Sequence, residues 1–152
     1  MLPPQSVSKA EITLPPAIVV HGLAQALAAL AAGRPVTLLS APGAGAFAGA
    51  LWWRALVAQA RTAHPATPCA DILDCADAPG RAMAAIRAGQ EILVLDPACP
   101  AFPRLAALAR TLPLCILAAR PPALDLAAHG AERRLHAWLE QGASDDSTAA
   151  LR

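Results

Sequence analysis

Arg34-Pro-Val-Thr-Leu-Leu-Ser-Ala-Pro-Gly-Ala-Gly-Ala-Phe-Ala-Gly49 is the stretch that decides the fold class of this chain. The run 36–39 is short, continuous and apolar, which is typical of a strand buried on both faces. Pro42, Gly43 and Gly45 end that strand, and the apolar segment 46–60 is long enough for a helix. The first N–H groups of such a helix face the region beyond the strand, where they can bind an anion.

The same order of apolar run, turn and alanine-rich helix recurs along the chain. We expect strands over 17–20, 36–39, 69–75, 92–95 and 114–117. In the helix 46–60, Trp52 and Leu56 should face the sheet, because they lie four residues apart and opposite the arginines. The alternation predicts an α/β fold with a three-layer, doubly wound sheet of about five mainly parallel strands, flavodoxin-like or Rossmann-like. The leading strand order is 2-1-3-4-5, and half of a βα barrel is the alternative.

Length and composition limit the domain organisation and the partners. A chain of 152 residues predicts one domain, over 17–140, with a flexible tail over 1–16 and a disordered tail over 141–152. The formal net charge is +1 and the basic residues are scattered, so we expect no nucleic-acid partner. The most apolar window, 17–32, is too short to span a bilayer. Since the amino terminus also lacks the layout of a secretory signal, we expect a cytoplasmic protein without a membrane partner.

Reactive residue types are also restricted. The four cysteines form no C-x-x-C pair, which favours free thiols over a metal site. The single lysine, Lys9, lies near the amino terminus, so a Walker A loop and a core Schiff-base lysine are absent. No G-x-S-x-G motif surrounds Ser40, and no H-E-x-x-H motif occurs. No particular cofactor is specified.

Polar residues follow the expected strands. The carboxyl ends of parallel strands meet at one edge of the sheet, where ligands bind in open α/β folds. The residues that should gather there are His21, Ser40, Gly43, Gly45, Asp74, Asp77, Asp96 and Arg120. We assign His21 and Asp74 as candidate catalytic residues, which hold hydroxyls or move a proton, and the other six as candidate ligand-binding residues.

Each of these residues also has a structural explanation. Asp77 suits a helix N-cap, and Asp96 before a proline suits a turn. A carboxylate at Asp74 must be solvated or paired, and His21 can bond a neighbouring carbonyl. Arg120 can bind an anion or pair with a carboxylate, either Asp96 or Asp125. Ser40 can cap its own turn.

Gly43, Gly45 and Gly49 have the G-x-G-x-x-x-G spacing of some dinucleotide-binding loops, with Asp74 as the candidate ribose-binding acid. Close packing of the helix on the sheet through Ala46 and Gly49 explains the same residues. Over 17–140 the pattern resembles small flavodoxin-like or Rossmann-like domains, and this resemblance implies the fold but no particular activity.

Two functions fit the sequence. The first is a small-molecule binding domain, with or without enzymatic activity, that holds an anionic metabolite or nucleotide at the carboxyl edge; the amides of 44–46 and Arg120 would take the anion. The second is a non-catalytic regulatory or homo-oligomeric module, in which Trp53, Trp138 and alanine-rich helices dock a second copy or a partner.

Overall fold

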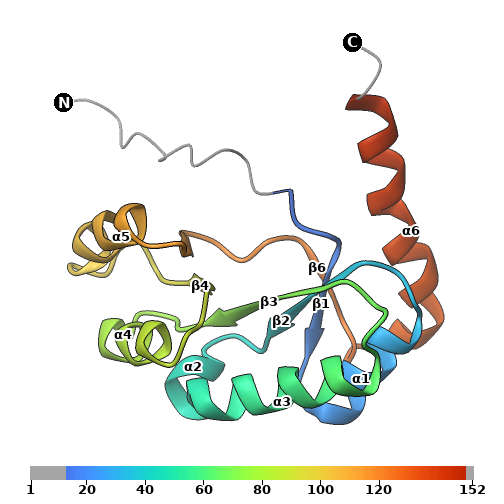
Figure 1. The fold of residues 1–152 in the computed structure, drawn as a ribbon, viewed down its shortest axis with the longest axis horizontal. Coiled ribbons are helices and arrows are strands. Elements are labelled where there is room, and N and C mark those ends of the chain that lie inside the picture. The colour runs from blue at the N-terminus through green and yellow to red at the C-terminus, as the bar shows by residue number, and fades with distance from the viewer. Residues whose placement is uncertain (1–12, 150–152) are drawn as a thin grey trace.

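The computed structural model of the protein describes residues 13–149 and contains six parallel strands and six helices (Figure 1). The strands are β1 (Ala17–Val20), β2 (Val36–Ser40), β3 (Cys69–Asp74), β4 (Ile92–Val94), β5 (Cys115–Leu117) and β6 (Ala123–Asp125). The helices are α1 (Leu23–Ala31), α2 (Ala44–Phe47), α3 (Ala50–Ala63), α4 (Pro79–Arg87), α5 (Phe102–Thr111) and α6 (Ala131–Ala149). The predicted α/β class and parallel sheet are therefore confirmed.

The predicted strand order is wrong. The sheet has the order β5-β4-β3-β2-β1-β6, so β2 and not β1 lies next to β3. The place on the other side of β1 is taken by β6, a strand of three residues that the sequence analysis missed. The chain thus winds in one direction from β1 to β5 and then returns to the opposite side of β1. This reversal makes the sheet doubly wound, with its switch point between β1 and β6.

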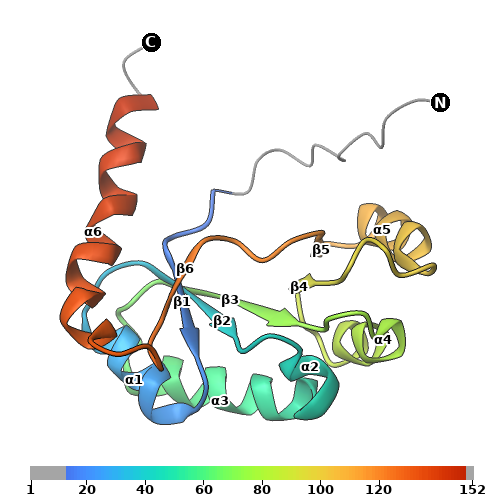
Figure 2. The ribbon, with the colours of Figure 1, turned by 180° about the vertical axis from the view of Figure 1, so that it is seen from behind.

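The main hydrophobic core lies between the sheet and the helices. Ile18 and Val20 of β1 belong to it, together with Leu38 of β2 and Leu73 of β3, and side chains from the helices complete it. The crossovers from β1 to β5 all move the same way along the sheet, and right-handed crossovers of that kind place their helices on one face. Figure 2 shows α1 and α3 together on this face.

The second face of the sheet is covered by extended chain. Its cluster consists of Val19, Leu39, Ile72 and Val94, and no helix residue among the described ones belongs to it. The connection 118–122 passes from β5 to β6 on the side opposite α1 and α3 (Figure 1, Figure 2). A right-handed crossover that moves the other way must use this face.

The predicted tails are only partly described, since residues 1–12 and 150–152 lie outside the described residues. Residues 13–16 are attached to the sheet: Thr37 donates hydrogen bonds to the carbonyls of Pro15 and Pro16, and Leu14 packs on the second face. At the other end, α6 continues beyond Glu140, where the last helix was expected to stop, to Ala149.

The predicted orientation of α3 is confirmed at Leu56, which is 5% exposed and belongs to the main core, but is wrong at Trp52. Trp53 is fully buried and faces the sheet, whereas Trp52 is 37% exposed. Trp52–Leu56 and Trp53–Val57 have the same spacing, so periodicity could not separate the two faces. The indole N–H of Trp53 donates to the carboxylate of Asp71, a contact that favours the observed orientation.

Candidate functional site

The carboxyl edge brings His21 and Asp125 together. His21 directly follows β1, Asp125 ends β6, and Nε2 of His21 lies 2.8 Å from Oδ1 of Asp125. The two side chains are 38% and 44% exposed, so the pair is open to solvent. The pair spans the switch point of the sheet, the place where open α/β folds bind ligands.

The amino terminus of α1 begins beside this pair. Its N-cap is Gly22, which has no side chain to cap the helix, and the first turn contains no acidic residue. The side chain of Gln25 is used for the backbone N–H of His21. The first-turn N–H groups of an α-helix have no partner within the helix and carry the positive end of its dipole. The switch point therefore combines a histidine, a carboxylate and a helix amino terminus.

Asp125 is held in its charged form. Its slight burial acts to raise the pKa of the carboxyl group, but the N–H of Ala127, the hydrogen bond and charge of His21, and the charge of Arg120 outweigh that effect. The net result is a pKa below the ordinary value. The carboxylate, 2.8 Å from Nε2, orients the imidazole ring.

Ser40, Asp74 and Arg120 form a second cluster at the same edge. Asp74 is 4% exposed; its Oδ2 accepts a hydrogen bond of 2.6 Å from Arg120, and its Oδ1 accepts the N–H of Ala76. Arg120 also donates to the carbonyl of Ser40, whose hydroxyl accepts the N–H of Asp74. Arg120 therefore pairs with Asp74 and not with Asp96 or Asp125, and it attaches the connection 118–122 to the ends of β2 and β3.

The glycine-rich turn packs against the end of β3. A Cβ atom on Gly45 would lie 2.8 Å from Sγ of Cys75 and 2.9 Å from the carbonyl oxygen of Asp74, so this position excludes any side chain. Gly43 has a φ of +72°, which also favours glycine. The N–H groups of Ala44 and Ala46 bond to carbonyls within the turn. Packing therefore accounts for Gly45, and positive φ values, +72° and +89°, account for Gly43 and Gly49. Two of the three amides proposed for an anion are already used.

The two remaining candidates follow β3 and β4. Asp77 is exposed and precedes α4, whose N-cap is Ala78. Asp96 is exposed, and its Oδ1 accepts the N–H of Ala98, which makes it a turn former. Neither residue has an ion-pair partner within residues 13–149. Their predicted role in ligand binding stays a prediction.

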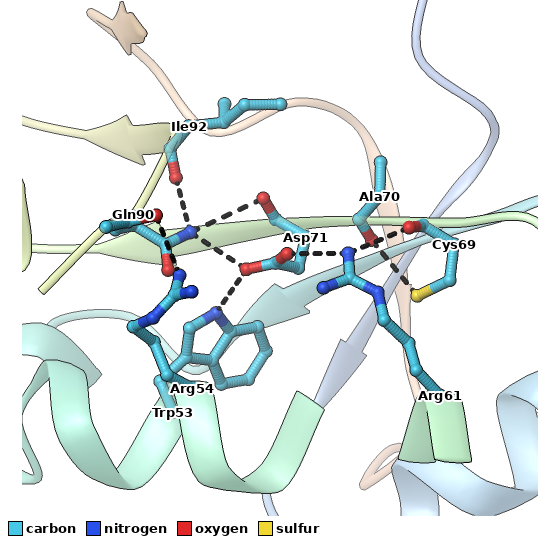
Figure 3. Close-up of polar contacts among 9 residues, drawn as sticks. Trp53, Arg54, Arg61, Cys69, Ala70, Asp71, Gln90 and Ile92 are labelled. Carbon is cyan, nitrogen blue, oxygen red and sulfur yellow. Dashed lines mark hydrogen bonds and ion pairs between the residues drawn. The ribbon is translucent and has the colours of Figure 1, made fainter. Parts of the chain in front are cut away.

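A partly buried polar network centred on Asp71 was not predicted from the sequence. Its carboxylate accepts hydrogen bonds from Trp53, Arg61 and Gln90, at 3.0, 2.9 and 2.8 Å (Figure 3). These three donors come from α3 and from the turn before β4, so no local motif could reveal them. A surface hollow of about 380 Å³ lies beside Asp71. Neither this hollow nor a second one, along the amino edge of the sheet, is lined by a predicted site residue.

Comparison with other proteins identifies no family for this chain. The chain matches no model of a known protein family, and no curated protein sequence matches it. Within the described part of the chain, no group of three His, Cys, Asp or Glu side chains could hold a metal ion, and no helix is long and apolar enough to cross a membrane.

Proposed function

We propose that this protein is a small-molecule binding domain that holds an anionic metabolite, bearing a phosphate or a carboxylate, at the carboxyl edge of its sheet. The observation that carries the proposal is the contact of 2.8 Å between His21 and Asp125 across the switch point of the sheet. Neither residue of this exposed pair belongs to the main hydrophobic core, so core packing does not require them. A ligand at this place would lie outside the carboxyl ends of β1 and β6, as in other open α/β sheets.

The anion would bind at the amino terminus of α1. Its free N–H groups and dipole favour negative charge, and the absence of acidic residues in its first turn leaves that preference intact. His21, oriented by Asp125, would add a further hydrogen bond. In this arrangement Asp125, and not Asp74, is the carboxylate that acts together with His21.

If the protein is an enzyme, His21 is its proton carrier. A histidine oriented by a carboxylate can accept a proton from a bound substrate hydroxyl and return it to a leaving group. Asp74 and Arg120 would keep the neighbouring strand ends in place, since their charged groups already bind each other. None of the four cysteines forms a disulfide, which suits the cytoplasm that we propose as the location.

An exposed apolar surface supports the second candidate, a homo-oligomeric module. Phe47 and Leu51 are 74% and 78% exposed, and Trp52 lies beside Leu51 at 37%. Contiguous exposed apolar residues often mark an interface. Trp53, named for this role from the sequence, is fully buried and cannot serve it. Light scattering of the protein and of Leu51→Glu tests this candidate: a dimer that becomes a monomer in the variant supports it, and a monomer in both cases refutes it.

A thermal-shift screen tests the ligand proposal. The panel contains inorganic phosphate, nucleotides, sugar phosphates and small organic acids, because a ligand at about one hundred times its Kd stabilises a protein by about 2.7 kcal/mol. We expect stabilisation by one class of anion, lost in His21→Ala and kept in His136→Ala, which removes an exposed histidine on α6. No stabilisation by any class, or an equal effect in both variants, would refute the proposal.

A further inference from the structure

The hollow beside Asp71 is a second candidate ligand site, separate from the carboxyl edge. It has a volume of about 380 Å³, within the range of small-molecule pockets. Four charged residues are among those that line it, two basic and two acidic: Arg54, Arg61, Asp71 and Glu91. Arg54 and Arg61 project from α3 toward β3 on either side of Trp53 (Figure 3).

One pair of these charges is already satisfied. Asp71 is 13% exposed, and both of its carboxylate oxygens accept hydrogen bonds. Arg61 donates to Oδ1 of Asp71 and also to the carbonyl of Cys69. These contacts balance the two charges and fix the floor of the hollow. Asp71 and Arg61 therefore hold the shape of the site and leave the binding of a ligand to other groups.

The other basic group, Arg54, is positioned without being neutralised. Its Nη1 donates to the carbonyl of Gly89 at 2.8 Å, which holds the guanidinium group beside the hollow. It makes no ion pair with any carboxylate of residues 13–142. A guanidinium group has five N–H donors, so most of those on Arg54 are left for a ligand. A fixed guanidinium group of this kind suits a carboxylate, which it can bind through two parallel hydrogen bonds.

Glu91 supplies the opposite charge in the same hollow. It lies exposed on the wall and forms no ion pair with Arg54 or with Arg61. Next to it in the chain, Gln90 is 2% exposed, and its Oε1 has no hydrogen-bond partner among the described residues. Buried polar atoms nearly always have a hydrogen-bond partner, so this acceptor is a place for a water molecule or a ligand. The hollow thus has a positive residue, Arg54, and a negative residue, Glu91, that do not pair with each other. The acceptor Oε1 of Gln90 lies in the neighbouring network of Asp71.

We propose that this hollow binds a small zwitterion, a free α-amino acid, with its carboxylate on Arg54 and its ammonium group on Glu91. A simple anion would be attracted by Arg54 and repelled by Glu91. A simple cation would be attracted by Glu91 and repelled by Arg54. Only a ligand with both charges satisfies both groups. The hollow is lined mainly by polar groups, with Ala70 and Ile92 as its aliphatic part, so a small or polar amino acid fits better than an aromatic one.

Nuclear magnetic resonance titrations of the ¹⁵N-labelled protein test this proposal. The probes are glycine, L-alanine, L-serine and L-glutamate, with propionate and ethylamine as ligands that carry one charge only. We expect at least one amino acid to shift the amide signals of Gly89, Gln90 and Glu91 in a saturable way, and propionate and ethylamine to bind at least about tenfold more weakly.

Variants assign the two contacts. Arg54→Gln and Glu91→Gln should each weaken binding of the amino acid by about tenfold or more, because each removes one charge-assisted contact. Both side chains are exposed, so the variants should keep the spectrum of the folded protein. Arg87→Gln, an exposed arginine on α4 outside the hollow, is the matched control and should bind normally. No saturable shift with any amino acid, equal binding of propionate, or unchanged affinity in both variants would overturn the proposal.

Discussion

His21 and Asp125 are 104 residues apart in the chain, yet their side chains meet at 2.8 Å across the ends of β1 and β6. This contact exists because the last strand returns to the opposite side of β1. It places a titratable pair at the one point of the sheet where the direction of winding reverses. The pair therefore links the topology of the chain to its proposed function.

Asp125 should make the free energy of unfolding depend on pH in the acid range. Its carboxyl pKa is lowered from 3.8 in the folded protein, so its contribution to stability is present above about pH 4 and is lost as the pH falls through the lower folded value. Urea unfolding between pH 2.5 and 6 should show a smaller loss of stability on acidification in Asp125→Asn than in the wild type. Glu132→Gln, which removes an exposed carboxylate in the first turn of α6, is the control. Identical pH profiles for Asp125→Asn and the wild type would contradict the assignment.

Arg120→Ala should strongly destabilise the protein. The variant leaves the carboxylate of Asp74, which is 4% exposed, without its cation, and breaking a buried ion pair in this way costs about 3–5 kcal/mol. Arg34→Ala removes an exposed ion pair with Glu140 and should cost only about 0–1 kcal/mol. Chemical denaturation of both variants measures the difference. Equal, small losses would mean that the ion pair at the ends of β2 and β3 contributes little.

Gly45→Ala should destabilise the fold by about 1–3 kcal/mol, because the new methyl group would meet Cys75 and the backbone of Asp74. Gly80 in α4 has open space around its Cβ position. Gly80→Ala should therefore leave stability unchanged or raise it by up to about 1 kcal/mol, since alanine favours a helix more than glycine does. Thermal melting of the two variants would show whether close packing at Gly45 requires a glycine there. An unchanged melting temperature in Gly45→Ala would contradict this.

The thiol of Cys75 should be unreactive in the folded protein. Burial, helped by the charge of Asp74, raises its pKa from 9.0 to about 12. The stability that comes from keeping this thiol neutral is fully present below pH 9 and is lost as the pH rises toward 12. We expect Cys75 to react with a thiol reagent at pH 8 only after unfolding in urea, and Cys75→Ala to lose less stability between pH 9 and 11 than the wild type. Rapid labelling of Cys75 in the native state, located by mass spectrometry, would contradict this.

Most strands could be predicted because they are continuous apolar runs that end at polar or turn residues. The run 17–20 is the observed β1, and the run 36–39 is β2 without its last residue. Strand β6 was missed because Ala-Leu-Asp is not a continuous apolar run and follows two prolines, so it carries too little local signal. Its absence from the prediction made the strand order wrong, since β6 takes the place beside β1 that was given to another strand.

The candidate site was only partly predictable for the same reason. His21, Ser40 and Asp74 do lie at the ends of their strands, because a parallel sheet brings those ends to one edge. The partners of these residues depend on strand order and on long-range contacts. Asp125 was missed as the partner of His21, and Asp74 as the partner of Arg120. Asp71, partly buried under α3, could be assigned only once Trp53 was known to face the sheet.

Titration of the ¹⁵N-labelled protein with the best anion from the thermal-shift screen tests the central claim most directly. If the anion binds at the switch point, the amide signals of residues 22–25 and the ring signals of His21 should shift together in a saturable way, and His21→Ala should abolish these shifts. Shifts confined to residues 43–47, or no saturable shift at all, would contradict the proposal that the ends of β1 and β6 form the ligand site.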